Sequence, residues 1–416
     1  MKIRPGTPIQ IALHWDSKTI MPVGRLAYRD RRAFLEYDQA FLTTGLRISP
    51  LHHETRAQLD PPYNGEAFEG LHGVFADSLP DGWGRLLVDR RARQLGTDPA
   101  TLTPLDRLAC VGRGGIGALT YAPVFDVWDD ETAVLDLDQL AADAKRVLAG
   151  EVSDVIAALG KAGGSPGGAR PKALIALNAK GEAQHGTDEI PAGFEPFLVK
   201  FPGQDDPDDI AAIEEAYAQM ARAAGIDMSQ TRLIEDKKGE RYFATRRFDR
   251  VNGGRLHVHS ASGLLYSDFR IPALDYKDLI RLTRMVTRDR REAIKMFHLA
   301  IFNVLAHNRD DHARQFSFLM NRAGIWRLAP AYDLTFAAGP GGEHSTSVLG
   351  HGKNITRDHL LKLAGEADLN EKSASELIDR VATAIGEWRR FAADAGVTRK
   401  SASEIAQKLA DVRVWV

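Results

Sequence analysis

The chain has 416 residues, which is too long for one ordinary hydrophobic core, so two or more domains are expected. Its apolar fraction of 44% and charged fraction of 26% are typical of a folded soluble protein, and a net charge of −2 gives no sign of bulk nucleic-acid binding. Cys110 is the single cysteine, so an intramolecular disulfide is excluded and a reducing cytoplasm is the expected location. The start of the chain lacks the apolar core of a signal peptide, and no apolar run is long enough for a membrane span.

The first 255 residues alternate between strand-like and helix-like patterns. A basic helix is expected from Trp83 to Gly96, and an apolar-faced helix is expected within residues 135–160. Strands are expected over residues 173–177, 196–201 and 241–248. Between the last two strands, the pattern predicts a helix from Ile210 to Ala224, which the pair Asp208-Asp209 caps and Gly225 ends.

Beyond about residue 255 the pattern is almost entirely helical. Apolar residues recur at helical spacing from Arg290 to His307 and indicate a buried helix. Further helices are expected over residues 372–395 and 401–412. Strands and glycines first and helices last predict an α+β fold of the bilobal protein-kinase type, with the nucleotide held between the lobes.

The helix that ends near His307 leads into a loop with two adjacent carboxylates, Asp310 and Asp311, and a short hairpin then leads to Asp333. Protein kinases need this arrangement. One Asp orients the acceptor hydroxyl, an amide side chain a few residues later helps to hold metal, and an Asp after the hairpin holds Mg²⁺ against the nucleotide phosphates. The alternative is a solvated loop at a helix end, because loops are rich in Asp. The buried helix in front of the loop favours the functional interpretation.

The segment from Gly163 to Lys172 is rich in glycine, at positions 163, 164, 167 and 168. Glycine permits positive φ and lets backbone N–H groups approach an anion, so this segment is suited to covering ATP phosphates. It is not a Walker A motif, because no Gly-Lys-Ser/Thr opens a helix here. A flexible linker explains the glycines equally well.

Lys200 lies in an apolar strand, where it is either an exposed edge charge or a buried ammonium with an anionic partner. A strand lysine after a glycine-rich loop is the group with which kinases hold the α- and β-phosphates. Glu214 or Glu215 in the next helix can pair with it, although a solvated first turn explains both equally well. The stretch from Arg246 to Arg250 either reaches an adenine ring with its backbone or is a charged strand end.

Six segments occur in a fixed order along the chain: Val74 to Arg85, Gly164 to Lys172, Val199-Lys200, Arg247 to Arg250, Asp310 to Arg314 and Pro330 to Asp333. Together they resemble the HipA family of bacterial serine/threonine kinases, the toxin components of toxin–antitoxin systems. The resemblance runs through most of the chain. It implies an extra N-terminal subdomain over residues 1–125, a strand-rich nucleotide-binding lobe over residues 126–254 and an all-helical C-terminal lobe over residues 255–416.

The resemblance also implies a role for each matched position. It makes Asp310 the catalytic residue, Asp333 and Gln315 the Mg²⁺ ligands, and Ser165 the serine whose autophosphorylation switches the enzyme off. The residues that it implies at the nucleotide are Ser165, Gly167, Gly168, Ala169, Lys172, Lys200, Arg246, Phe248 and His312. The family has Asn where this chain has Gln315. The Gln amide oxygen sits on a longer stem, so it either ligates Mg²⁺ or only hydrogen-bonds the loop.

ATP and Mg²⁺ are therefore the cofactors that the resemblance implies. It also implies a protein substrate, such as an aminoacyl-tRNA synthetase, and a helix-turn-helix antitoxin as partner, with DNA contacted only through that antitoxin and no membrane involved. Two other functions stay open. One is a degenerate kinase fold that acts as corepressor and binds nucleotide without phosphate transfer. The other is a metal-dependent hydrolase that uses His307, Asp310, Asp311 and His312, which would leave Lys200 without a purpose.

Overall fold

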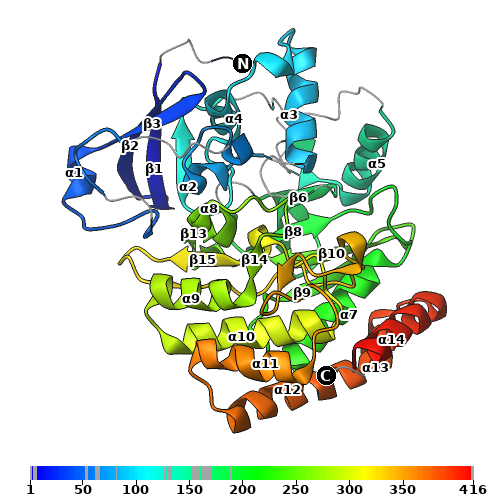
Figure 1. Cartoon of the computed structure of the whole chain (residues 1–416). Coiled ribbons are helices and arrows are strands. Elements are labelled where there is room, and N and C mark those ends of the chain that lie inside the picture. Colours follow the sequence, from blue (N-terminus) through cyan, green and yellow to red (C-terminus); the bar gives the residue numbers. More distant parts are fainter. Residues whose placement is uncertain are drawn as a thin grey trace. The chain divides into compact units, whose positions relative to one another are not determined.

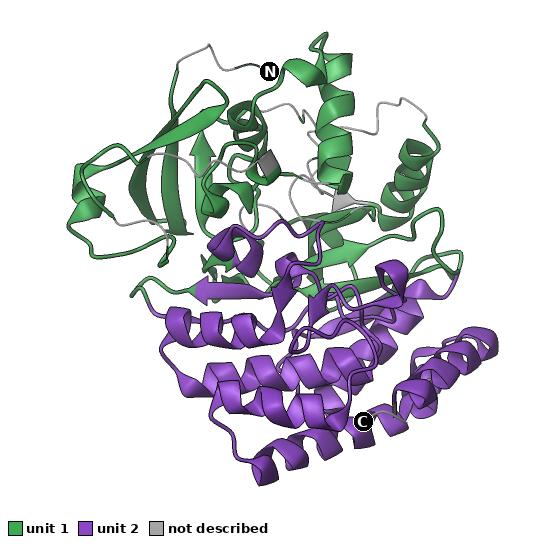
Figure 2. Cartoon of the chain, in the orientation of Figure 1, with its two compact units in different colours: residues 1–207, 234–259, 320–324 green, residues 208–233, 260–319, 325–416 purple. Residues whose placement is uncertain are grey.

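The computed structural model describes residues 2, 7–51, 55–60, 66–80, 82–125, 128, 134–150, 159–160, 168, 170–186 and 190–413. The chain has an α+β fold in which strands prevail early and helices prevail late (Figure 1). It forms two compact units (Figure 2): unit 1 consists of residues 1–207, 234–259 and 320–324, and unit 2 of residues 208–233, 260–319 and 325–416. The domain limits expected at residues 125 and 254 stay predictions.

Unit 1 is built around two large sheets. The first is antiparallel with strand order β3-β2-β1-β4, and the second has six strands in the order β5-β7-β6-β8-β10-β9. The strands are β1 (Ile9–Asp16), β2 (Thr19–Arg29), β3 (Arg32–Tyr37), β4 (Leu119–Ala122), β5 (Val134–Leu135), β6 (Lys172–Asn178), β7 (Ala183–His185), β8 (Phe194–Lys200), β9 (Thr231–Glu235), β10 (Arg241–Arg246), β11 (Arg250–Val251), β12 (Gly254–Arg255) and β13 (His257–Ser260). The helices are α1 (Gln39–Leu42), α2 (Gly73–Ala76), α3 (Gly82–Gln94), α4 (Pro104–Val111) and α5 (Leu137–Leu148), with 3₁₀ turns at Glu66–Phe68 and Pro99–Thr101.

The six-stranded sheet confirms the strands expected over residues 173–177, 196–201 and 241–248, which are β6, β8 and β10. Helix α3 confirms the expected basic helix, and α5 lies within the expected helical stretch 135–160. The apolar run of β6 is buried and shares one core with α3 residues such as Leu87 and with α5 residues such as Leu140. Burial on a central strand explains why this run lacks polar alternation.

A buried cluster of charges ties the end of β10 to the loop before β4. The Asp249 carboxylate accepts hydrogen bonds from Arg247 (2.8 Å), from Arg250 (2.6 Å) and from the backbone N–H of Gly117 (2.7 Å). Both guanidinium groups also donate to the carbonyl oxygen of Gly115, each at 3.1 Å. The interpretation as an ordinary charged strand end is therefore wrong for these three charged residues, which are buried and paired.

A second polar chain holds unit 1 together at β13. The His259 Nδ1 donates to Asp77 at 2.7 Å, and the Ser49 hydroxyl lies 3.1 Å from Nε2. The order Asp–His–Ser is that of a hydrolase triad. Ser49 is only 2% exposed, however, so a substrate cannot reach it, and the chain acts as an internal clamp.

Unit 2 is mainly helical. Its helices are α7 (Ile210–Ala223), α8 (Ala261–Leu265), α9 (Tyr276–Thr287), α10 (Arg290–Leu305), α11 (Arg357–Ala364), α12 (Glu371–Gly386), α13 (Trp388–Ala395) and α14 (Arg399–Arg413), with 3₁₀ turns at Ala313–Gln315, Pro340–Gly342 and Gly365–Ala367. Short strands also occur, namely β14 (Leu274–Asp275), β15 (Ser317–Met320), β16 (Trp326–Leu328) and β17 (Thr346–Ser347). Strands β15 and β16 confirm the expected hairpin before Asp333, so this part of the chain is mainly rather than wholly helical.

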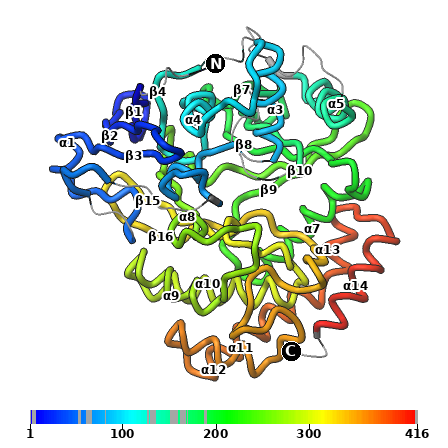
Figure 3. The backbone as a smooth tube through the Cα atoms, turned by 45° about the horizontal axis from the view of Figure 1, so that its top comes forward, coloured from blue at the N-terminus to red at the C-terminus, as the bar shows by residue number. Residues whose placement is uncertain are grey.

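Helix α10 is the central helix of unit 2 and confirms the helix expected from Arg290. Nearly all residues in its second half are buried, and α9, α11 and α12 pack against it (Figure 3). The Asp289 side chain caps its first turn by accepting from the N–H of Arg291 at 2.8 Å. The loop that follows α10 therefore starts from a fixed point in the core.

Two helix limits differ from expectation. The Asp209 side chain does not cap α7, because its carboxylate accepts from the N–H of Thr398 (2.8 Å) and the hydroxyl of Ser401 (3.0 Å) at the start of α14. The helix expected over residues 372–395 is divided at Glu387 into α12 and α13. At Asp209, contacts with residues far along the chain override a local capping signal.

Replacing Asp249 by Asn is expected to destabilise unit 1 by about 3–5 kcal/mol, because two buried guanidinium groups lose their counter-charge. Burial raises the pKa of Asp249, but Arg247 and Arg250 outweigh burial and hold it below its usual range. A depressed folded-state pKa gives stability that is present above the unfolded pKa of about 3.9 and is lost as the pH falls below it.

Urea unfolding of wild type and Asp249→Asn at pH 7 and at pH 3 to 4 measures both effects. The matched control is Glu36→Gln, which breaks the exposed pair of Glu36 with Arg25 and should cost less than about 1 kcal/mol. Equal losses for the two variants would contradict the assigned role of Asp249.

Candidate active site

The loop after α10 presents Asp310 between two anchored residues. The Asp310 side chain is 59% exposed. On one side, the Arg309 guanidinium donates to the carbonyl oxygens of Gly342 (2.6 Å) and Ala338 (3.3 Å). On the other side, Asp311 is fully buried. The loop therefore exposes one carboxylate while its neighbours fix the backbone on both sides.

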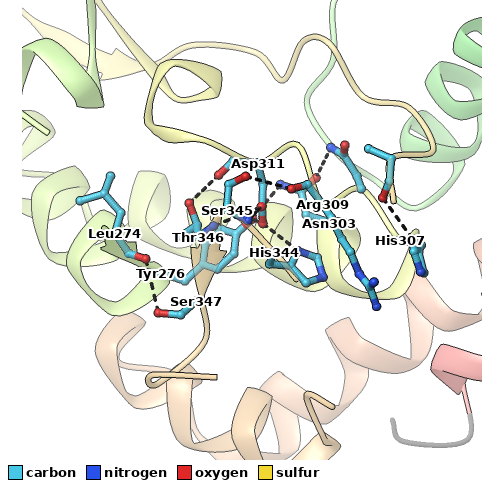
Figure 4. A network of polar contacts seen from close by, with 12 residues as sticks. Leu274, Tyr276, Asn303, His307, Arg309, Asp311, His344, Ser345, Thr346 and Ser347 are labelled. Carbon is cyan, nitrogen blue, oxygen red and sulfur yellow. Dashed lines mark hydrogen bonds and ion pairs between the residues drawn. The ribbon is translucent and has the colours of Figure 1, made fainter. Parts of the chain in front are cut away.

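The buried Asp311 carboxylate is saturated with hydrogen bonds (Figure 4). One oxygen accepts from the Tyr276 hydroxyl (2.7 Å) and from Nδ1 of His344 (2.9 Å). The other accepts from the backbone N–H groups of Ser345 (2.8 Å) and Thr346 (3.2 Å). The four donors are a hydroxyl, an imidazole and two backbone N–H groups. Because these donors occupy both carboxylate oxygens, Asp311 has a structural role within unit 2.

These contacts argue against the metal-dependent hydrolase. Asp311 has no lone pair left for a metal, so the expected set of His307, Asp310, Asp311 and His312 loses one of its carboxylates. Nδ1 of His307 donates to the carbonyl oxygen of Ala337 at 3.2 Å, which leaves only Nε2 of this ring as an acceptor. Burial lowers the pKa of His307, and the nearby Arg309 lowers it further. Across the described ranges, His, Cys, Asp and Glu side chains nowhere form a group of three or more that could hold a metal ion.

The structure brings Gln315 and Asp333 together. The Gln315 amide nitrogen donates to the Asp333 carboxylate at 3.1 Å. The segments that carry them are joined by the Tyr332 hydroxyl, which donates to the Arg314 carbonyl at 2.5 Å and lies 2.7 Å from the Ser317 hydroxyl. The two ends of the β15–β16 hairpin are thus held side by side.

This pair fits a magnesium site. Turning the Gln315 amide about its last bond would exchange its nitrogen for its oxygen, next to the carboxylate of Asp333. Mg²⁺ is usually bound by one or two protein carboxylates together with phosphate oxygens and waters, so a cage of three acidic residues is not required. Asp333 has a φ of +57°, an uncommon conformation outside glycine that often marks functional positions.

The ring of His312 is held next to Asp310. Its Nδ1 accepts from the backbone N–H of Arg314 at 3.2 Å, which places the proton of the neutral ring on Nε2. Nε2 lies 4.0 Å from the Asp310 carboxylate. The Phe269 ring packs against His312 and Arg314. Its centre lies 5.5 Å from the centre of the His312 ring and 4.1 Å from the guanidinium carbon of Arg314.

In unit 1, the sheet places Lys172 and Lys200 directly opposite each other. They are Cα partners in the antiparallel pair β6–β8, so their side chains leave the same face. Strand β8 lies inside the sheet, so the expectation of an edge charge for Lys200 is wrong. Phe243 on β10 continues the row, and the Lys200 ammonium lies 5.5 Å from its ring centre.

Gly168 lies close above the Lys172 ammonium. A Cβ at this position would come within 2.6 Å of Lys172 Nζ, and the φ of +104° also favours glycine. The Gly168 carbonyl accepts from the N–H of Trp83 at 3.0 Å, which ties it to α3. Ser165, Gly167 and Ala169 lie outside the described residues. Like charges directly opposite each other in a sheet are unusual, because they repel.

Glu214 and Glu215 of α7 are not solvated, so the expectation of a solvated first turn is wrong. Glu214 and Glu215 are both buried. Glu215 accepts from the side chains of Gln219 (3.1 Å) and Arg222 (3.3 Å) within unit 2. The pairing of one of these carboxylates with Lys200 stays a prediction.

The two residues expected near adenine lie at the end of β10. Arg246 forms an ion pair with Glu195 at 3.0 Å, with its side chain 41% exposed, and Phe248 is half-buried in the turn that follows. An adenine contact by either residue stays a prediction.

Three structural residues of the site could not be singled out from the sequence. In the sequence Asp311 stood out only as the second carboxylate of the loop, and Tyr332 and His344 carried no pattern of their own. The one available signal was adjacency, because Asp311 and Tyr332 each stand next to a residue that the kinase motif marks.

Models of two domain families match the chain. The HipA-like C-terminal domain matches residues 164–413, and the HipA N-terminal domain matches residues 17–122. The chain belongs to the HipA family. The C-terminal match contains the Lys172–Lys200 pair as well as the Asp310 loop and Asp333, so one family model covers all the described site residues.

Two solved structures were compared with the chain, and one of them shares its fold. HipA in the toxin–antitoxin complex of HipA, HipB and operator DNA from Shewanella oneidensis MR-1 has a TM-score of 0.69 at 16% identity, and the match covers 97% of this chain and 95% of that one. It establishes a common fold. The Helicobacter pylori proinflammatory kinase CtkA matches at a TM-score of 0.34 and 12% identity over 53% of this chain and 92% of its own, which is too low to support an argument.

A curated relative of this HipA-family chain is "Putative kinase Y4mE" of Sinorhizobium fredii, 26% identical over 240 residues, or 54% of this chain. The match covers 47% of the relative, so the chain spans about half the length of the curated relative it matches. Among the described residues, none of the helices combines the length and apolar character that a bilayer span requires.

If Gln315 is a Mg²⁺ ligand, Gln315→Ala should raise the Mg²⁺ concentration needed for nucleotide binding by about 10-fold or more, and Gln315→Asn should preserve the wild-type dependence. Calorimetric titration of nucleotide at a series of Mg²⁺ concentrations measures this. Tyr332→Phe is the control, because it loosens the same hairpin without removing a ligand oxygen. Identical Mg²⁺ dependence of Gln315→Ala and wild type would show that Gln315 only hydrogen-bonds the loop.

Proposed function

We propose that this chain is an ATP- and Mg²⁺-dependent protein serine/threonine kinase that acts as a HipA-like toxin. The observation that carries the proposal is an exposed Asp310 in a fixed loop, followed by the adjacent pair Gln315 and Asp333, in a chain of the HipA family. The kinase name of the Sinorhizobium relative is in line with it.

Asp310 would accept a hydrogen bond from the acceptor hydroxyl and orient its oxygen for in-line attack on the γ-phosphorus. The new P–O bond then forms as the bond to the bridging oxygen of ADP breaks, and the hydroxyl proton passes to the Asp310 carboxylate. The exposure of Asp310 allows a protein side chain to reach it. Mg²⁺, held by Asp333 and Gln315, would offset charge on the phosphates.

The nucleotide phosphates would bind at the Lys172–Lys200 face of the six-stranded sheet. Both ammonium groups leave the same face, and Gly168 allows the glycine-rich segment to lie close to Lys172. One of the buried carboxylates Glu214 and Glu215 would pair with Lys200. Arg246, Phe248 and His312 would complete the nucleotide site.

The proposed partner is a helix-turn-helix antitoxin, with DNA contacted only through it. The Shewanella structure, in which HipA is bound to HipB and operator DNA, supports this choice. The proposed substrate is a translation-related protein such as an aminoacyl-tRNA synthetase, and the proposed location is the cytoplasm. Family membership is the support for both.

A catalytically weak corepressor is the second candidate. It is favoured by one observation, namely that Gln315 stands beside Asp333 where the family has the shorter Asn, which changes the reach of the amide oxygen. Nucleotide binding without phosphate transfer, together with binding of an antitoxin, would select this function over the kinase.

Asp310→Asn should keep nucleotide binding and lose phosphate transfer by about 10²–10⁴-fold, which is the usual cost of removing a group that positions or deprotonates the nucleophile. Incubation with γ-labelled ATP and Mg²⁺ measures the transfer, and growth after expression without an antitoxin measures toxicity. Asp394→Asn, a similarly exposed carboxylate on α13, is the control and should behave as wild type. Near-normal transfer by Asp310→Asn would refute the assigned role of this loop.

Ser165 is expected to carry the phosphate after self-modification. A phosphate adds about −1.5 to −2 charge, which would compete with nucleotide phosphates for Lys172 and Lys200. Mass spectrometry of the incubated protein should find the modification in wild type and Ser165→Thr but not in Ser165→Ala, and Ser165→Asp should bind ATP more weakly. An active wild-type enzyme modified only at other residues would contradict this switch.

A further inference from the structure

Two buried carboxylates hold the same short segment of unit 2. Asp311 binds its first part, through the backbone N–H groups of Ser345 and Thr346. Asp275 binds its second part, accepting from the Ser347 hydroxyl (2.7 Å) and from the N–H of Gly350 (2.7 Å). Residues 345–350 are therefore clamped at both ends, and we call them the clamped segment.

The two clamps differ in what lies next to them. Asp275 also caps α9 by accepting from the N–H of Lys277 at 2.9 Å, and its strand β14 pairs in parallel with β17. Asp311, in contrast, is the immediate neighbour of Asp310. One clamp joins the segment to a helix start, and the other joins it to the proposed catalytic loop.

The residue before Asp310 is tied to the same region. The Arg309 carbonyl accepts from the backbone N–H of Ser345 (3.2 Å) and from its hydroxyl (3.1 Å). The Arg309 N–H donates to the carbonyl of Ala337 at 3.4 Å. Both neighbours of Asp310 are thus bonded to the stretch that follows Asp333.

A buried relay connects this arrangement to helix α10. The Asn303 amide donates to the Tyr276 hydroxyl at 2.9 Å, and its oxygen accepts from the Asn308 amide at 3.0 Å (Figure 4). The Tyr276 hydroxyl in turn donates to Asp311 at 2.7 Å. All four side chains are buried, so the relay sets where Asp311 lies relative to the core.

We propose that Asp311 is a positioning residue for phosphoryl transfer: by binding the clamped segment and Tyr276, it fixes the backbone that carries the Asp310 carboxylate. The inference rests on the proposed kinase function and adds a residue to it. Asp311 itself is inaccessible and does not touch a substrate. Its effect is geometric, because a displacement of about 1 Å in a reacting group can cost about 10²-fold in rate.

The chemistry of Asn shows what Asp311→Asn would do. The carboxylate accepts four hydrogen bonds, whereas an amide offers one oxygen and one donor group. The amide NH₂ would then face the Tyr276 hydroxyl and the His344 Nδ1 or the two backbone N–H groups. Burial, and then the charge of Asp311, raise the pKa of Tyr276, so its hydroxyl stays protonated and remains a donor. The clamp must shift, and the Asp310 backbone shifts with it.

The test compares Asp311→Asn with Asp275→Asn. Both variants disturb a buried carboxylate that binds the clamped segment, but only the first adjoins Asp310. We expect kcat of Asp311→Asn to fall by about 10²-fold, with its ATP affinity within about 3-fold of wild type. We expect kcat of Asp275→Asn to stay within about 3-fold of wild type, even if its melting temperature falls as much as that of Asp311→Asn. Tyr276→Phe, which removes a single donor, should give an intermediate loss of kcat.

Hydrogen exchange of the backbone provides a readout that does not need turnover. In Asp311→Asn the amides of Ser345 and Thr346 and of residues 308–312 should exchange faster, and in Asp275→Asn exchange should rise at Gly350 and Lys277 instead. Unchanged exchange near Asp310, or equal loss of kcat in the two Asn variants, would overturn the positioning role. A wild type that transfers no phosphate would instead refute the proposed function and leave the exchange result to decide on Asp311. If Asp311→Asn does not fold, Tyr276→Phe decides by the same measurements, and wild-type kcat and exchange in it would overturn the role.

Discussion

Burial of the Asp311 carboxylate is the constraint on which the rest of unit 2 depends. A buried charge costs several kcal/mol unless hydrogen bonds replace its lost water, so its partners must be present and well placed. Here four donors from two segments meet the requirement: Tyr276 at the start of α9, and the His344 side chain with the N–H groups of residues 345–346. Satisfying one carboxylate therefore fixes how the exit of α10, the start of α9 and the stretch after Asp333 meet.

Unit 1 uses the same principle with different partners. Asp249 is also a buried carboxylate next to a loop, but two guanidinium groups bind it in addition to one neutral donor, the N–H of Gly117. The difference suits the two positions. Ion pairs at Asp249 bring the loop before β4 to the end of β10, where several carbonyl groups also need donors. Around Asp311, a tyrosine hydroxyl, an imidazole and two backbone N–H groups take the place that guanidinium groups have at Asp249.

The sequence allowed the regular elements to be predicted because their signals are local. Apolar periodicity gave α10, and apolar runs gave β6, β8 and β10 within a few residues. The misses at Asp209 and Asp311 have a common origin in distant contacts. Asp209 looked like a cap for α7, but its partner Thr398 is 189 residues away. Likewise, Asp311 is hydrogen-bonded to Tyr276, which is 35 residues away in the sequence, and no local pattern predicts such a pair.

For the candidate site, the order of the motifs along the sequence predicted which residues take part, but only the structure shows which residues they contact. The opposition of Lys172 and Lys200 follows from strand register, which neither lysine specifies by itself. These positions also break local rules, since like charges face each other in a sheet and Asp333 has a positive φ. Natural sequences tolerate such violations mainly where function requires them. Both violations fall on residues that are proposed to bind phosphate and Mg²⁺, which is where a functional requirement would override the local preferences of the chain.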